Sequence, residues 1–309
     1  MHLNHKYTLL ILILIMLAPV PATAEKITLM LDGGPNVDHL PIYLARESGY
    51  FDDHHVEVEI ITPSGSGDTL SLAASGKVDI AVSYQPRAII AADQGMDIKA
   101  VAPLVTRPLT TLIYLDEEIK TPADLSGKTI GFTMPGVTEM MLRVFADING
   151  ITDYTPVNMG VPSLISNEVD AVMVPCKTYD TMGMEQQGYD ARLFELEKYG
   201  IPDYEELIFV AGSKTLDEKA EAIRGFVKAI RIALAEVQID PEIAMGLYLE
   251  ALPEADEARE TRAYELTRPY FAGPEGHDPV KWQAFADFAL ARGLIRNRVD
   301  TADLIHTWE

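Results

Sequence analysis

Short apolar segments with strand character alternate with helical segments from the start of the folded chain, and this alternation limits the fold more than any other feature. The first three apolar segments span residues 27–31, 56–61 and 78–83, and helix-like segments that end at Gly49 and Gly76 separate them. Strands that alternate with helices are typical of βαβ units, in which helices cover the faces of a parallel sheet. The sequence therefore predicts an α/β fold with mixed, mostly parallel sheets.

A second series of strands and helices begins after Arg107-Pro108, and the C-terminal third of the chain is mainly helical. This organisation predicts two lobes, in which residues 25–105 and 206–309 form the first and residues 106–205 form the second. The chain then crosses between the lobes twice. We expect the crossings to act as a hinge beside a cleft at the carboxyl ends of the strands.

Residues 1–24 have the features of a secretory signal peptide. A weakly basic start precedes an unbroken apolar run over residues 9–17, and Ala22-Thr23-Ala24 supplies the small residues that a signal peptidase requires. The apolar run is shorter than the roughly 18–20 residues that span a bilayer. We therefore expect cleavage near Ala24 and a periplasmic location.

Charge and cysteine content exclude several classes of function. The chain has 25 basic and 47 acidic side chains, a formal net charge of −22 at pH 7. Nucleic-acid binding needs clustered Lys and Arg, so we expect no nucleic-acid partner, although such a charge also simply keeps an exported protein soluble. The single cysteine, Cys176, excludes an internal disulfide and a thiolate metal cluster, and we interpret it as a buried filler. We expect no metal and no cofactor.

Polar and aromatic residues follow two of the expected strands in the first lobe. Asp38 and His39 lie in the loop after the first strand, and Tyr84 directly follows the third. The carboxylate could accept from an amine, the imidazole could stack on a heterocycle, and the tyrosine could form one wall of an aromatic sandwich. Alternatively, Asp38 caps the helix that opens near Pro41, and Tyr84 packs at the rim. The spacing does not decide between these interpretations.

Two turns in the second lobe precede helices and could also face the cleft. The backbone N–H groups of Gly136, Val137 and Thr138 could hold a carbonyl, formyl or phosphate oxygen. Tyr179 and Asp180 follow a later strand, and a carboxylate beside a tyrosine could accept from the amine and protonated ring nitrogen of an aminopyrimidine. In both turns the alternative is an ordinary first helical turn whose polar residues complement the helix dipole.

Several of these residues lie within longer segments that together resemble a known family. The segments are Pro35-Asn36-Val37-Asp38-His39, Glu47-Ser48-Gly49-Tyr50-Phe51, Ser75-Gly76-Lys77-Val78-Asp79, the stretch 120–128 and Gly200-Ile201-Pro202-Asp203-Tyr204. Over most of the chain beyond the signal segment, they resemble the pyrimidine-precursor binding proteins of bacterial thiamine-salvage transporters. They also resemble the yeast-type thiamine-pyrimidine synthases, which share that fold. The Ser-Gly-Lys-Val-Asp segment is shared with sulfonate, nitrate and riboflavin binders, whereas the Asp-His loop and the Tyr-Asp pair are more discriminating.

The resemblance implies a two-lobed periplasmic-binding-protein fold of type II. It also implies a function: the substrate-binding subunit of an ABC importer, which captures a formylaminopyrimidine or hydroxymethylpyrimidine in the cleft. The partners implied are this small heterocycle and a permease in the inner membrane, with the binding protein a monomer. Asp38, His39 and Tyr84 match ligand-facing positions, the segment 136–138 matches a backbone cradle, and Asp180 stands where the pyrimidine binders have a glutamate.

The chain departs from the pattern at two tryptophan positions, which Gly33 and Lys177 occupy. Loss of two aromatic walls could widen the pocket, and the Lys177 ammonium could favour a carboxylated or phosphorylated ligand. Alternative cargoes are therefore riboflavin, a sulfonate or another carboxylated heterocycle. A further alternative is an exported enzyme acting on a pyridoxal or pyrimidine substrate. The synthases use a cysteine-rich motif and a histidine near the position of Arg87, which this chain lacks, so we predict a binding protein and not an enzyme.

Overall fold

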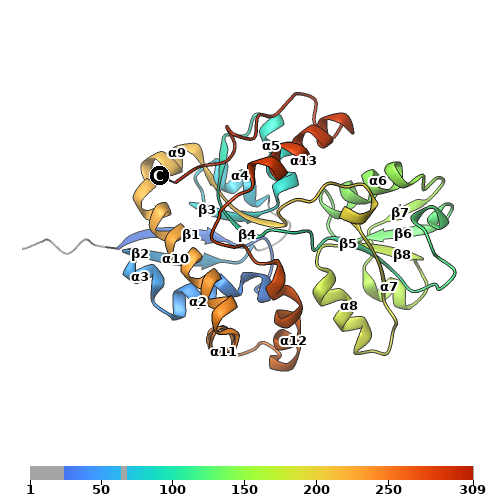
Figure 1. Cartoon of the computed structure of the whole chain (residues 1–309), viewed down its shortest axis with the longest axis horizontal. Coiled ribbons are helices and arrows are strands. Elements are labelled where there is room, and N and C mark those ends of the chain that lie inside the picture. Colours follow the sequence, from blue (N-terminus) through green and yellow to red (C-terminus); the bar gives the residue numbers. More distant parts are fainter. Residues whose placement is uncertain (1–23, 64–67, 309) are drawn as a thin grey trace, which may run out of the picture.

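The structure is a computed structural model that describes residues 24–63 and 68–308. Apart from Ala24, the predicted signal peptide lies outside the described residues. Figure 1 shows two α/β lobes side by side, each built around its own sheet. The first lobe contains β1–β4 and β10 with their helices, and the second contains β5–β9 with theirs.

The sheet of the first lobe has the strand order β2-β1-β3-β10-β4. The strands β1 (Glu25–Met30), β2 (Val56–Ile61) and β3 (Ile80–Ser83) pair in parallel. β10 (Leu207–Gly212) runs antiparallel between β3 and β4 (Ile98–Val105), so the other four strands point the same way. The predicted mixed, mostly parallel sheet is confirmed.

The sheet of the second lobe repeats this plan with the order β7-β6-β8-β5-β9. Its parallel strands are β7 (Thr155–Val157), β6 (Thr129–Phe132) and β8 (Ala171–Val174). β5 (Thr111–Tyr114) runs antiparallel between β8 and β9 (Arg192–Glu195). Strands β5, β7 and β9 are short, and sequence periodicity did not identify them.

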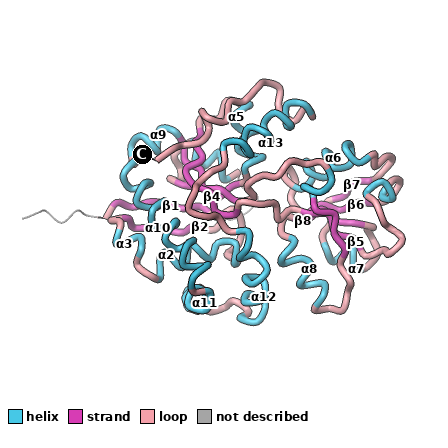
Figure 2. Tube along the Cα trace, in the orientation of Figure 1, coloured by secondary structure: helices cyan, strands magenta, loops and turns pink. Residues whose placement is uncertain are grey.

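Helices cover both faces of each sheet (Figure 2). The helices of the first lobe are α2 (Leu40–Glu47), α3 (Tyr50–Asp53), α4 (Thr69–Ala74), α5 (Gln85–Asp93), α9 (Ser213–Glu218), α10 (Ala220–Ile239), α11 (Pro241–Ala251), α12 (Glu257–Thr267) and α13 (Pro279–Ala291). Those of the second are α6 (Thr138–Asn149), α7 (Val161–Ile165) and α8 (Lys177–Glu185). The C-terminal third is mainly helical, as expected, and Lys219 leaves the helical conformation and separates α9 from α10. None of the described helices is long and apolar enough to cross a membrane.

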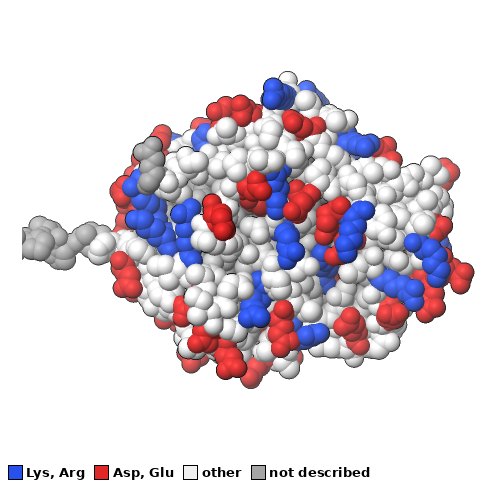
Figure 3. Space-filling model, in the orientation of Figure 1, with Lys and Arg blue, Asp and Glu red and all other residues white. Residues whose placement is uncertain are grey.

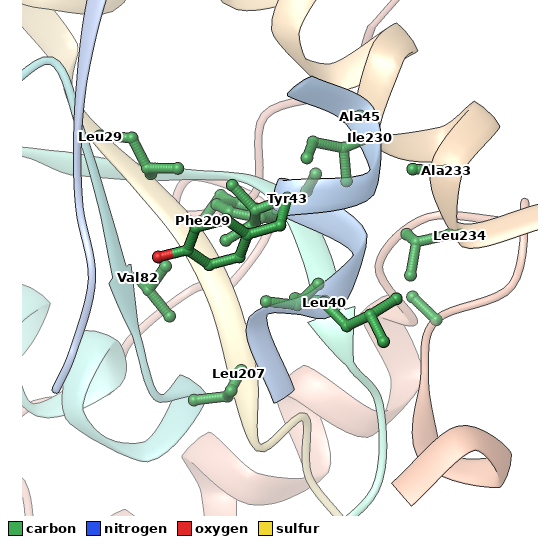
Figure 4. Close-up of a cluster of buried hydrophobic side chains, with 14 of the residues drawn as sticks. Leu29, Leu40, Tyr43, Ala45, Val82, Leu207, Phe209, Ile230, Ala233 and Leu234 are labelled. Atoms are coloured by element: carbon green, nitrogen blue, oxygen red, sulfur yellow. The ribbon is translucent and has the colours of Figure 1, made fainter. Parts of the chain in front are cut away.

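The core of the first lobe lies between its sheet and helices α2 and α10. Leu29 and Phe209 project from the sheet toward Leu40 and Tyr43 of α2 (Figure 4). Phe226 of α10 packs edge-on against Phe209, with 5.1 Å between ring centroids. Full burial of each such side chain contributes roughly 1.5–3 kcal/mol, so this layer holds the first lobe together independently of the cleft.

The chain passes between the sheets at residues 106–110 and 200–206, and one buried side chain joins the two passages. The Glu206 carboxylate accepts hydrogen bonds from the backbone N–H groups of Leu109 (2.6 Å) and Thr110 (2.9 Å), and from Thr110 Oγ1 (2.8 Å). The crossings are thereby held side by side, as a hinge requires. The predicted lobe boundaries at residues 106 and 206 remain a prediction.

The surface charge is mixed on the face that Figure 3 shows. Acidic and basic side chains are interspersed over both lobes on this face. Since the acidic residues outnumber the basic ones by 47 to 25, the molecule as a whole remains strongly negative. A field of this sign repels polyanions and attracts cations.

Candidate functional site

A cavity of about 330 Å³ lies where the two lobes meet. The first lobe supplies the loop after β1, the 3₁₀ turn η1 (Val37–His39) and the end of β3, and the second supplies the loops after β6 and β8. The lining residues are Asp32, Gly33, Asn36, Asp38, His39, Tyr84, Met134, Pro175, Cys176, Glu206 and Leu207. A volume of this size is suited to a small heterocycle.

Asn36, and not Asp38, caps the turn that follows β1. The Asn36 side chain accepts a hydrogen bond from the backbone N–H of Asp38 at 2.9 Å, and α2 begins at Leu40 with no side-chain cap. The capping interpretation of Asp38 is therefore wrong. Asp38, which is 6% exposed, lines the cavity instead.

His39 and Tyr84 both bind Asp32. His39 Nε2 lies 2.7 Å from Asp32 Oδ1, and the Tyr84 hydroxyl donates to Asp32 Oδ2 at 2.6 Å. Burial disfavours the charged carboxylate, but these hydrogen bonds and the His39 ring still hold the pKa of Asp32 below its ordinary value. Since an ionised carboxylate only accepts, His39 donates from Nε2. The three side chains form one fixed wall of the cavity.

Asp38 carries a carboxylate oxygen that the protein leaves available in the cavity. Its Oδ2 accepts from the Cys176 thiol at a Sγ–Oδ2 distance of 3.4 Å. Its Oδ1 is buried and has no hydrogen-bond partner among the described residues. Burial raises the pKa of Asp38 to about 6, which reflects the cost of keeping a charge there. A ligand that donates an N–H to Oδ1 would remove that cost.

The β6–α6 turn does not offer its amides to this cavity in the present conformation. The backbone N–H groups of Val137 and Thr138 both donate to the Met134 carbonyl, at 3.1 and 3.0 Å. Thr138 Oγ1 accepts from the N–H groups of Thr133 and Met134, so this side chain stabilises the turn itself. Gly136 lines a separate groove of about 360 Å³. The role of the three residues as an oxygen cradle therefore remains a prediction.

Lys177 lies beside the cleft but faces away from the cavity. Its Nζ is 2.9 Å from Glu195 and 3.7 Å from Glu197, and it lies 5.0 Å from the ring centroid of Tyr270. Two glutamates and an aromatic face therefore satisfy the ammonium, although it was expected to attract an acidic ligand. Lys177 is not among the lining residues of the cavity.

Tyr179 joins the two lobes. Its hydroxyl donates to Glu260 Oε2 of α12 at 2.6 Å and accepts from the Val37 backbone N–H at 2.8 Å. Asp180 on the same helix is half-buried, and burial raises its pKa to about 6. Its carboxylate does not line the cavity. Tyr179 thus holds the Val37–His39 turn from across the cleft, and a ligand-binding role for either residue remains a prediction.

Gly33 leaves open space at the cavity wall. A Cβ placed there would meet no other atom within 4 Å. This is the position at which the resemblance expects a tryptophan. The open space is therefore consistent with a wider pocket than one bounded by an aromatic wall.

Comparison with known proteins identifies the family. A family model described as NMT1/THI5 like matches residues 36–244 of the 309. This chain belongs to the NMT1/THI5-like family. A Haemophilus influenzae protein, whose name assigns it to thiamine biosynthesis, is 32% identical to this NMT1/THI5-like protein over 279 residues and 88% of each chain. A formylaminopyrimidine-binding protein of Halalkalibacterium halodurans is 30% identical over 75% of this chain and 72% of its own.

More distant relatives connect the NMT1/THI5-like protein to enzymes and to a common fold. A Saccharomyces cerevisiae 4-amino-5-hydroxymethyl-2-methylpyrimidine phosphate synthase is 26% identical over 81% of this chain and 78% of its own. The periplasmic aliphatic sulphonate-binding protein of Escherichia coli has a TM-score of 0.71 at 16% identity, covering 91% of this chain and 97% of its own. The expected periplasmic-binding-protein fold is confirmed.

Among the lining residues that sequence analysis did not assign to the site, three have titratable side chains: Asp32, Cys176 and Glu206. Asp32 almost directly follows β1, so the strand-end position that pointed to Asp38 and His39 could have indicated it. Cys176 was interpreted only as a filler, although it follows β8 in the same way. Glu206 precedes β10, and no pattern in the sequence indicates that its carboxylate reaches the cavity.

Proposed function

We propose that this chain is the solute-binding subunit of a periplasmic ABC importer and that its cargo is a thiamine-related pyrimidine, of the formylaminopyrimidine or hydroxymethylpyrimidine type. The name and identity of the Halalkalibacterium relative support this cargo. The two-lobed fold with an interlobe cavity supports a protein that closes on a ligand. Its partner is then an inner-membrane permease, to which the monomer delivers the ligand unchanged.

The observation that carries the cargo is the acceptor-rich lining of the cavity. Asp32, Asp38 and Glu206 supply three carboxylates, and the described lining residues include neither Lys nor Arg. Asp38 Oδ1 is the oxygen left without a protein partner. Aminopyrimidines present an exocyclic amine and a protonatable ring nitrogen, which donate to such a group in a charge-assisted hydrogen bond.

The same lining argues against the alternative cargoes. A sulfonate or a carboxylated heterocycle would place a negative charge beside the ionised Asp32 and the carboxyl group of Asp38, without a Lys or Arg to compensate it. Glu206 contributes less negative charge, because burial raises its pKa to about 7. Burying the charge of such a ligand without a partner is strongly unfavourable. The Lys177 ammonium was the feature that suggested an acidic ligand. This ammonium already contacts Glu195 and Glu197.

We infer a binding role for Asp38, His39 and Tyr84, and we assign Tyr179 to closure of the lobes. Asp38 accepts from the ligand, Tyr84 bounds one side of the ring, and His39 and Asp32 fix that wall. No catalytic role is assigned to these residues. The cavity thiol of Cys176 is a poor nucleophile, because burial raises its pKa well above the ordinary value.

The test is isothermal titration of the purified protein with formylaminopyrimidine, riboflavin and an alkanesulfonate. We expect binding of the pyrimidine and no measurable heat with the other two. After incubation, mass spectrometry should recover the pyrimidine unchanged. Tight binding of the sulfonate or the flavin alone would refute the cargo, and turnover of the pyrimidine would refute the non-enzymatic role.

A further inference from the structure

The sheet of the first lobe ends at β4, in the strand order β2-β1-β3-β10-β4. The sequence of β4 is IKAVAPLV, in which Lys99 is the one charged residue. An edge strand presents a row of backbone N–H and C=O groups, and a strand of another molecule can pair with such a row. A protein that stays monomeric therefore has to cover or interrupt the row along β4.

The second half of β4 is protected in two ways. Pro103 has no N–H to donate, and proline within a sheet is confined to edge strands and bulges for this reason. Beyond it, the segment 270–272 covers the strand, and the Ala272 N–H donates to the Leu104 carbonyl at 2.9 Å. The row that another strand could bind is thereby reduced to residues 98–102.

The segment 304–308 covers this remaining row. The Ala100 N–H donates to the Leu304 carbonyl at 2.9 Å, and the Ala100 carbonyl accepts from the His306 N–H at 2.8 Å. These bonds form an isolated parallel bridge, so the segment occupies the place of a sixth strand at the β4 edge. Leu304 is buried there, with 4% of its surface exposed.

Two side-chain contacts fix the segment at its ends. The Trp308 indole N–H donates to the Val101 carbonyl at 2.8 Å. On the other side, the N–H and the hydroxyl of Thr301 donate to Gln283 Oε1 of α13, at 3.1 and 3.0 Å. Because the Thr301 contact is made to α13, the segment beyond it can leave β4 while the preceding chain stays in place.

A second copy of this chain fits the row that the segment covers. Two β4 strands can pair antiparallel about a two-fold axis at Ala100, which gives the self-complementary contact of a symmetric dimer. In that register Lys99 of each copy lies opposite Val101 of the other. The net charge of −22 opposes association in general, but this contact brings no carboxylates together.

We propose that the segment 304–308, held by its main-chain pairing with Ala100, keeps the protein monomeric, and that a second copy of the chain binds the β4 edge when the segment is released. The segment and the second copy compete for the same N–H and C=O groups of β4. This inference does not depend on the proposed cargo.

The first experiment compares His306→Pro with His306→Ala in the full chain. Both variants lose the imidazole, but only proline loses the N–H that donates to Ala100. We expect the Ala100 amide to exchange with deuterium at least about tenfold faster in His306→Pro, because release of the segment exposes it. Sedimentation velocity should show a dimer of His306→Pro, with a dissociation constant at least about tenfold below that of His306→Ala.

Either of two results would overturn the proposal. Equal exchange in the two variants would show that main-chain pairing does not hold the segment on β4. Fast exchange in a variant that stays monomeric at every concentration would show that the free edge does not bind a second copy. Trp308→Ala, which loosens the segment from its other end, should also exchange faster at Ala100 and self-associate, and a monomer with fast exchange would again contradict the proposal.

The second experiment tests whether the dimer contact is the β4 edge. A peptide of residues 299–308, added in excess to dimeric His306→Pro, should bind the released edge and return the protein to the monomer. The same peptide with proline at position 306 is the matched control and should leave the dimer intact. A dimer that resists the unmodified peptide would place the contact elsewhere and overturn the proposal.

Discussion

Among the residues, the two aspartates that sequence analysis singled out have different surroundings. The loop position after a strand indicated Asp38, and the resemblance indicated Asp180 in place of a glutamate. Asp38 lines the cavity, whereas Asp180 does not. Sequence cannot separate them, because whether a first-turn acid faces a cleft depends on the packing of α8 against the other lobe. Asn36, two residues before Asp38, performs the capping that spacing had allowed for Asp38.

The Asp38 environment predicts a pH dependence of stability. Its pKa in the folded protein, about 6, lies above the ordinary 3.8, so the folded state binds the proton more tightly than the unfolded state. The stability that this group contributes is therefore present at low pH and is lost as the pH rises through about 6. The charged and titratable groups around it are Asp32, His39, Tyr84, Cys176, Tyr179, Asp180, Tyr248 and Glu260.

Asp38→Asn should raise the free energy of unfolding by roughly 1–3 kcal/mol at about pH 8 and change it little at about pH 3, below the ordinary pKa of the carboxyl group. Urea unfolding of both proteins at the two pH values measures this difference. An effect of equal size at both values would mean that the charge of Asp38 is not the cause.

Among the elements, α8 and α12 form the contact between the lobes that bears on ligand binding. Glu260 Oε2 of α12 accepts from Tyr179 of α8 at 2.6 Å and from Tyr248 of α11 at 3.1 Å. The first bond crosses the cleft, and the second lies within the first lobe. The strand and helix alternation predicted α8, but the sequence gives no sign of which helix of the other lobe it meets.

Tyr179→Phe should weaken ligand binding about 5- to 20-fold, because it removes hydrogen bonds that form only when the lobes close. Tyr248→Phe is the matched control: it removes a bond to the same oxygen of Glu260 without crossing the cleft, so it should lower stability and leave affinity within about twofold. Titration calorimetry with the aminopyrimidine measures both. Equal losses of affinity would show that Glu260, and not the interlobe contact, matters.

Close packing of α10 on β2 gives a prediction that is independent of the ligand. A Cβ at Gly225 would lie 2.8 Å from the His54 carbonyl oxygen and 2.8 Å from Val56, whereas one at Gly246 of α11 would meet nothing within 4 Å. Gly225→Ala should therefore destabilise the protein by about 1–3 kcal/mol. Gly246→Ala should stabilise it by roughly 0.5–1 kcal/mol, because alanine favours the helix. Thermal unfolding of the two variants checks the opposite signs.

For the whole molecule, the sequence predicted the lobes and the cleft better than the strands that close each sheet. β1–β4 follow the alternation of strand and helix, and their parallel pairing results from it. β5 follows β4 with no helix between them, and β9 has only four residues, so the alternation of strand and helix does not reveal either strand. The hinge also depends on contacts distant in sequence: Glu205 binds His277 Nδ1 at 2.6 Å, while Glu206 holds Leu109 and Thr110.

The central claim is that the interlobe cavity binds an aminopyrimidine through Asp38. A crystal structure of the protein with formylaminopyrimidine tests it most directly. We predict closed lobes, the ring beside Tyr84, and the exocyclic amine within about 3 Å of Asp38 Oδ1. A pyrimidine bound against Asp180, with Asp38 Oδ1 still unpaired, would contradict the account.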